Sequence, residues 1–249
     1  LTKEGDTVML CQPVYFPFFH LITENKRNQV LSELVLTDGK YKMDFDDIEK
    51  KIKNYHVKIF LLCSPHNPVC RVWEKQELIQ LAEICLKYHV YILSDEIHSD
   101  LIYKGYQHIP IAALSESINN ITITCTAPTK TFNLAGLQAA NLFVKDPVIR
   151  HKIEKECVKT GYSNLNSMAV DAALAAYQYG EQWLLALLSY LEENVKYLNF
   201  FLKEQNYGIH LIHPEGTYLM WLDCRELGLN NKELFELFLN KAGLWLHNG

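Results

Sequence analysis

Short apolar runs rich in β-branched residues alternate along the first part of the chain with longer amphipathic segments. This alternation is typical of βαβ units built around a parallel sheet. Most of the runs are apolar at nearly every position, so we expect central strands that are buried on both faces. The runs that predict strands cover residues 7–11, 29–36, 58–64, 90–95, 121–126 and 139–144.

One amphipathic segment is especially regular. Residues 74–89 place Leu78, Leu81 and Cys85 on one face at helical spacing. The segment lies between the third and fourth apolar runs, so it predicts the crossover helix of a βαβ unit. The predicted fold class is therefore α/β, with a mostly parallel sheet.

The pattern changes after residue 144. Pro147 suits the first turn of a helix, and two long helical segments follow, roughly 164–179 and 181–205, with no strand between them. A new strand-like alternation then begins at GIHLIH and TYLMWLD. We therefore predict a large sheet domain over residues 1–185 and the start of a smaller α+β domain over residues 186–249.

Composition narrows the functional class only slightly. The 249 residues carry a net charge of −5 without any basic block, which argues against nucleic acid or an anionic membrane as a partner. No apolar run reaches the roughly 18 residues of a membrane span. The seven cysteines are dispersed and odd in number, which is typical of reduced thiols in a cytoplasmic protein. The N-terminus lacks both a signal-peptide pattern and an initiator Met, so we expect a chain truncated at both ends.

Unusual polar residues follow four of the predicted strands. Tyr15, Asn67 and Lys130 come just after the first, third and fifth runs, and Asp95 ends the fourth. In open α/β sheets, ligands bind beyond the carboxyl ends of the strands. A lysine there can form a Schiff base with an aldehyde cofactor, and an acid can keep a pyridine nitrogen protonated. An amide can bond a phenolate oxygen, and an aromatic ring can stack on the cofactor.

Each of these residues has an ordinary alternative interpretation. Lys130 alone would be a solvated surface lysine, Asp95 a helix cap and Tyr15 an aromatic residue at the edge of the core. Their joint position on neighbouring strand ends favours a cofactor site.

The sequence also bears on two other kinds of site, a metal site and a dinucleotide site. Cys63, His66 and Cys70 fall within eight residues, as zinc ligands often do, but no second Cys/His pair completes a tetrahedral set. We therefore expect no metal. No G-x-G-x-x-G turn follows any strand, which argues against a dinucleotide-binding domain.

Three segments carry a resemblance to a known family: SPHNP, SDEIHSDLIY and TAPTKTFNLAGLQ. Together with the spacing of Asn67, Asp95 and Lys130, they resemble the fold-type I enzymes that depend on pyridoxal 5′-phosphate (PLP), the class I/II aminotransferase superfamily. Within it, the last two segments are most similar to the cystathionine β-lyase-type C–S lyases. The resemblance runs over essentially the whole chain and implies a three-layer α-β-α large domain and a homodimer.

The resemblance also assigns roles to residues. It implies that Lys130 holds the cofactor covalently and moves the Cα proton, that Asp95 pairs with the pyridine nitrogen, and that Asn67 bonds the ring hydroxyl. Tyr15 would stack on the ring, and the Asn67-Pro68 bond would be cis. Further contacts to the cofactor are implied for His98, Thr126 and Thr129.

The sequence departs from the family pattern at three positions. Cys70 replaces a Gly that commonly follows Asn-Pro-x, so we expect strain if this position has positive φ. Gln138 replaces an Arg that binds phosphate in classical aminotransferases, and Ala127 replaces a Ser common there. The Gln favours the lyase subgroup.

The resemblance implies α,β-elimination, in which L-cystathionine or a related cysteine S-conjugate yields pyruvate, ammonia and a thiol. The first alternative is an aminotransferase, because both reactions begin with removal of the Cα proton. The second is a truncated, non-catalytic protein that keeps the fold, because the family's N-terminal phosphate-binding segment and C-terminal carboxylate-binding Arg are not in these 249 residues.

Overall fold

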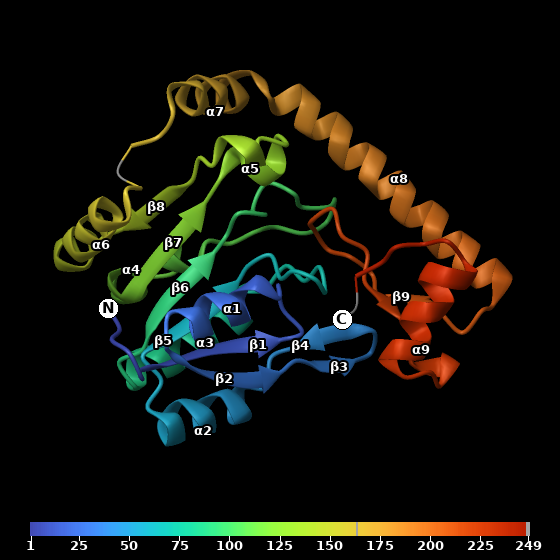
Figure 1. The fold of residues 1–249 in the computed structure, drawn as a ribbon, viewed down its shortest axis with the longest axis horizontal. Coiled ribbons are helices and arrows are strands. Elements are labelled where there is room, and N and C mark those ends of the chain that lie inside the picture. The colour runs from blue at the N-terminus through green and yellow to red at the C-terminus, as the bar shows by residue number, and fades with distance from the viewer. Residues whose placement is uncertain (163, 248–249) are drawn as a thin grey trace.

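A computed structural model describes residues 1–162 and 164–247. Within them, a mostly parallel sheet has the strand order β2-β1-β5-β6-β7-β8, and β8 alone runs antiparallel to its neighbour (Figure 1). The predicted fold class is confirmed. The strands are β1 (Thr7–Gln12), β2 (Asn28–Glu33), β5 (Ile59–Cys63), β6 (Tyr91–Asp95), β7 (Thr122–Thr126) and β8 (Asn141–Val144).

Helices cover both faces of this sheet. In β1, Val8 and Leu10 pack against α1 (Pro17–Glu24), whereas Met9 points to the opposite face. That opposite face is covered by α2 (Phe45–Tyr55), α3 (Lys75–Lys87) and α4 (Glu116–Ile121). Leu93 of β6 contacts the clusters of both α1 and α6 (Pro147–Thr160), so these two helices share a face. The three-layer arrangement follows from the two-residue alternation of strand side chains.

Helix α3 forms where the amphipathic pattern predicted it. Its start is set by a capping box in which Glu74 and Glu77 satisfy each other's backbone N–H groups. The predicted apolar face is fully buried, with Leu78, Leu81 and Cys85 at 0% exposure. Burying each leucine contributes roughly 1.5–3 kcal/mol.

One predicted strand was wrong. The run over residues 29–36 does not form a single strand but divides into β2 and β3 (Val35–Thr37), and β3 turns back to pair with β4 (Lys40–Lys42). Asp38 and Gly39 make this turn with φ values of 52° and 75°. Two consecutive positive φ values are what a tight hairpin turn requires, and Asp-Gly supplies them at low cost. The continuous apolar composition concealed the break.

The C-terminal part is dominated by two long helices. Helices α7 (Ser167–Tyr179) and α8 (Glu181–Gln205) carry the chain across the molecule to α9 (Asn231–Glu236) (Figure 1). The predicted strands there shrink to β9 (His210–Leu211) and β10 (Leu222–Asp223), which pair with each other.

The division into residues 1–185 and 186–249 stays a prediction. Helix α8 runs through this boundary without a break, and residues 248–249 lie outside the described part of the chain.

Among the helices of the described chain, none is long and apolar enough to cross a membrane.

The remaining elements are short. The short elements are α5 (Pro128–Thr131), η1 (Ile111–Ala113), η2 (Ala135–Leu137), η3 (Arg225–Leu227) and η4 (Leu237–Lys241).

Candidate active site

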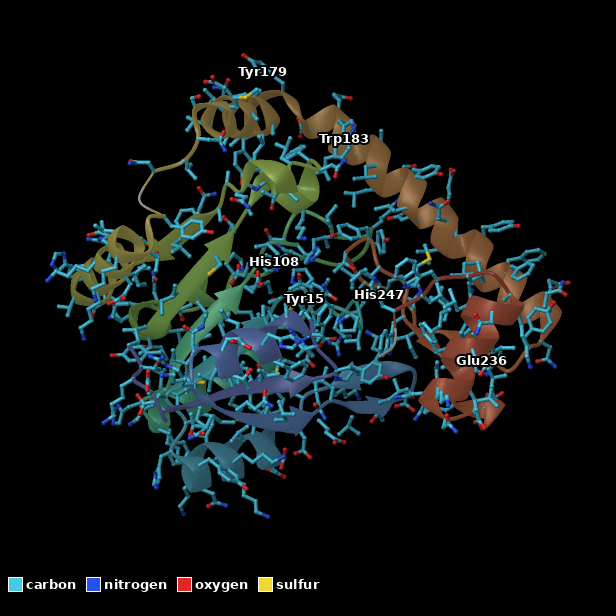
Figure 2. The ribbon with its side chains drawn as sticks, in the orientation of Figure 1. Tyr15, His108, Tyr179, Trp183, Glu236 and His247 are labelled. Carbon is cyan, nitrogen blue, oxygen red and sulfur yellow. The ribbon has the colours of Figure 1, made fainter. Side chains whose placement is uncertain are left out.

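A cleft of about 670 Å³ lies beyond the carboxyl ends of the strands, where an α/β sheet binds its ligands. Figure 2 shows two of its lining residues, Tyr15 and His247, near the centre of the molecule. The lining comes from six parts of the chain: Gln12–Phe16 with Phe19; Glu33–Leu34; Asn67–Pro68; Lys130; Tyr218, Leu219 and Trp221; and His247.

The loops after β1 and β5 are tied together. The Tyr15 N–H donates to the Asn67 carbonyl at 3.0 Å. Burial lowers the pKa of His66 to about 4, so its ring is neutral, and Nε2 must be the donor to the Pro13 carbonyl at 2.8 Å. The Asn67-Pro68 bond is cis, as expected. These contacts hold Tyr15 and Asn67 beside each other on the cleft wall.

Asp95 ends β6 between two neighbouring strands. Burial raises the pKa of its carboxyl to about 6, against the lowering effects of a 3.3 Å hydrogen bond from the Ile97 N–H and of the positive charge of Lys130. Lys130 lies on α5, just past β7. The two residues are far apart in sequence, but the register of β6 and β7 brings their strand ends together.

His98 lies next to the same lysine. Its ring is 3% exposed, and burial, followed by the charge of Lys130, lowers its pKa to about 4. The ring packs edge-on against Tyr218 with centroids 5.4 Å apart. Nδ1 of His98 is buried and makes no hydrogen bond to the described residues. A buried polar atom without a partner costs free energy, so Nδ1 marks a place where a polar ligand would be stabilised.

The predicted site residues do not all reach the cleft surface. Tyr15, Asn67 and Lys130 line it. Asp95 and His98 are not part of the lining, but the positive charge of Lys130 acts to lower the pKa of each of them. Two further predicted residues are half-buried: Thr126 ends β7 and Thr129 lies in α5. The Thr126 hydroxyl accepts a hydrogen bond from Asn141 at 3.3 Å.

Sequence reasoning missed one wall of the cleft. Tyr218, Leu219 and Trp221 line it, although the alternation in TYLMWLD predicts a strand of the smaller domain there. The segment from 212 to 221 is largely irregular, and within it Thr217 adopts a φ of 67°. The Gly-Thr pair inside an apolar alternation was the available signal of a break.

Cys63, His66 and Cys70 make separate contacts. Cys63 packs in the core beneath α1, His66 bonds to Pro13, and the Cys70 thiol contacts the Leu219 carbonyl at 3.2 Å. In the described chain, no group of three or more His, Cys, Asp or Glu side chains is placed to hold a metal ion.

Cys70 has a φ of 59° and is fully buried, so the strain expected at this position is present.

We predict that Cys70→Gly is more stable than Cys70→Ala by about 1 kcal/mol, because both lose the thiol contacts but only glycine accepts positive φ without a Cβ clash. Urea denaturation of the two variants measures the difference. A more stable alanine variant would contradict the assignment of strain.

The chain matches a known protein family over its whole length. The family model "Aminotransferase class I and II" matches residues 1–249. The chain belongs to the class I and II aminotransferase family. The recognition made from SPHNP, SDEIHSDLIY and TAPTKTFNLAGLQ is confirmed.

Individual members of the family are similar over the whole chain. Cystathionine beta-lyase PatB of Bacillus subtilis is 40% identical over 248 residues, which are 100% of this chain and 64% of PatB. Cystalysin of Treponema denticola, whose structure contains PLP, has a TM-score of 0.95 at 37% identity, covering 100% of this chain and 63% of cystalysin. The PLP-bound C-S lyase of Staphylococcus hominis has a TM-score of 0.91 at 31% identity, covering 100% and 63%. The chain thus spans a little under two thirds of these relatives.

Proposed function

We propose that this chain forms the catalytic centre of a PLP-dependent C–S β-lyase. Its substrate would be L-cystathionine or a related cysteine S-conjugate, and its products pyruvate, ammonia and a thiol. The observation that carries the proposal is the grouping of Lys130 with Asp95 and His98 at adjoining strand ends beside the cleft. The names of PatB and of the C-S lyase of Staphylococcus hominis support this reaction over others in the family.

The residues of the site fit PLP. The unpartnered Nδ1 of His98 can meet a polar ring substituent, and Asp95, whose carboxyl is mainly ionised at neutral pH despite a pKa raised by burial to about 6, can face a protonated pyridine nitrogen. Lys130 offers a primary amine at the cleft surface. When bound, PLP supplies an aldehyde that joins to amines and a pyridine ring that accepts electrons from Cα.

Each residue then has a defined task. Lys130 would carry the cofactor and take the proton from the substrate Cα. Asp95 would face the pyridine nitrogen, Asn67 the ring hydroxyl, and Tyr15 one face of the ring. Contacts to the ring substituents and the phosphate are proposed for His98, Thr126 and Thr129.

An aminotransferase is the second candidate, since the family model covers both reactions. Transamination uses the same amine to remove the same proton but returns it to the cofactor. A non-catalytic protein that retains the fold is the third candidate. Gln138 stands where classical aminotransferases keep an arginine for the phosphate, and this residue type favours the lyase.

The proposal is tested on the natural protein that carries these residues. It is mixed with PLP, reduced with borohydride and digested, and the labelled peptide is identified. A label on Lys130 supports cofactor binding. Addition of L-cystathionine to the unreduced protein should then release pyruvate and thiol. Transfer of the amino group to a 2-oxo acid would establish the aminotransferase instead, and no reaction with bound PLP would favour the non-catalytic protein.

Assembly and cellular location are part of the same proposal. We propose a homodimer, supported by large apolar side chains exposed along α7 and α8, among them Leu174 and Tyr190. We propose a cytoplasmic location, supported by cysteines that are all free thiols in the described structure.

A further inference from the structure

The segment Glu215–Thr217 lies between two parts of the sheet domain that are distant in sequence, one near Cys70 and the other near Tyr103. The Glu215 N–H donates to the Cys70 carbonyl at 2.9 Å, and the Tyr103 N–H donates to the Glu215 carbonyl at 3.1 Å. Between them, Gly216 approaches so closely that a Cβ would lie 2.7 Å from the Leu101 carbonyl oxygen. This backbone pairing places the following residues, Tyr218–Trp221, on the cleft.

The Glu215 carboxylate is buried at the centre of this junction, and the residue is 1% exposed. Arg71 Nε donates to it at 2.9 Å, Lys40 Nζ lies 2.8 Å away, and the Val72 N–H donates at 2.9 Å. Burial tends to raise its pKa, but the hydrogen bond from Lys40 and the charge of Arg71 outweigh burial and lower it. Glu215 is therefore a carboxylate that joins the β3–β4 hairpin, the loop after β5 and its own segment.

Arg71 has a second carboxylate partner, which lies at the start of α3. Its Nη2 lies 2.7 Å from Glu77, which belongs to the capping box at the start of α3. Glu77 thus binds the same guanidinium without touching the cleft wall. A buried ion pair does not by itself stabilise a fold strongly, because desolvation offsets the attraction. Glu215, unlike Glu77, belongs to the segment that leads directly into the cleft-lining residues Tyr218, Leu219 and Trp221.

We propose that Glu215 is a positioning residue for substrate binding: it locks the aromatic wall Tyr218–Trp221 against the Asn67–Val72 loop and so sets the affinity of the cleft for the substrate side chain. This inference rests on the proposed function, since it assigns the wall to the substrate. Arg71 is its principal partner, and Tyr218, which packs on His98, is the residue whose place it determines.

The test compares Glu215→Gln with the matched control Glu77→Gln in the holoenzyme. The glutamine amide would face the donors of Arg71 and Lys40, so the wall should loosen. Binding is measured by spectral titration with L-norleucine, the carbon isostere of S-ethyl-L-cysteine, which has no leaving group. Amide hydrogen exchange of residues 215–221 reports the wall directly.

For Glu215→Gln we expect a dissociation constant for L-norleucine and a KM for S-ethyl-L-cysteine that both rise about 10-fold or more, kcat within about threefold of the parent, and faster exchange over residues 215–221. Glu77→Gln should change binding by less than about twofold. Equal effects of both variants, or a fall in kcat alone, would overturn the proposal.

A second variant and the cofactor spectrum complete the test. If Glu215→Gln fails to fold, Lys40→Met removes only the partly exposed cation, whose side chain is 44% exposed, and should raise the same dissociation constant about twofold or more. An unchanged constant in that variant would also count against the proposal. A parent protein that takes up no PLP would instead refute the proposed function. The cofactor spectrum shows whether PLP is taken up before any variant is compared.

Discussion

Replacing Lys130 with alanine is expected to lower the rate of pyruvate formation from L-cystathionine by about 10³-fold or more. The lysine is proposed both to hold the cofactor and to move the Cα proton. Positioned general acid–base catalysis alone contributes about 10²–10⁴-fold. The same variant should lose borohydride-dependent labelling of the chain. Pyruvate formation and peptide mapping measure the two effects on one preparation.

Lys145→Ala is the matched control for this experiment. Lys145 is 40% exposed and pairs with Glu116 at 2.6 Å, so it lies on the surface. Its loss should leave turnover within about twofold, because exposed ion pairs contribute little. Labelling that persists in Lys130→Ala would place the cofactor on another lysine and refute the assignment.

Asp95→Asn should change stability and activity in opposite directions. The folded-state pKa of Asp95 is about 6, above the ordinary value of 3.8 for this side chain. The folded chain without cofactor therefore binds this proton more tightly than the unfolded chain does. The stabilising effect of the proton is present below about pH 4 and is lost as the pH rises through about 6. Above that range the buried carboxylate costs up to about 3 kcal/mol.

The neutral asparagine removes this cost. At pH 8 the cofactor-free Asp95→Asn variant should be more stable than the parent by up to about 3 kcal/mol, and its stability should decline less between pH 4 and 6. With cofactor, turnover should fall by about 10²-fold or more, because the charge facing the pyridine nitrogen is gone. Urea denaturation across pH and pyruvate assays provide the two measurements. A variant that is less stable than the parent at pH 8 would show that burial does not dominate at Asp95.

The meeting of Tyr15, Asn67 and Lys130 at one cleft was predictable for a topological reason. Parallel strands end at one edge of a sheet, so polar residues that follow successive strands must meet there. Tyr15, Asn67 and Lys130 line one cleft as a result. Their residue types were informative because each offers a different function: a ring, an amide and an amine.

Features set by turns were less predictable. The break between β2 and β3 depends on the Asp38-Gly39 turn, whereas the apolar run itself is compatible with one long strand. The Gly-Thr pair at 216–217 has the same effect in the C-terminal segment, where a φ of 67° at Thr217 interrupts the expected strand. Local composition does not show which partner a strand will pair with.

The amino-acid sequence alone was sufficient for the α/β class, the crossover helix and the set of residues at the strand ends, because these depend on periodicity and local order. Only the tertiary structure decided how the C-terminal segment reaches the cleft. Glu215 binds Arg71 across 144 residues of chain, and no local pattern encodes such a contact. The raised pKa of Asp95 and the unpartnered Nδ1 of His98 also depend on burial, which exists only once the chain has folded.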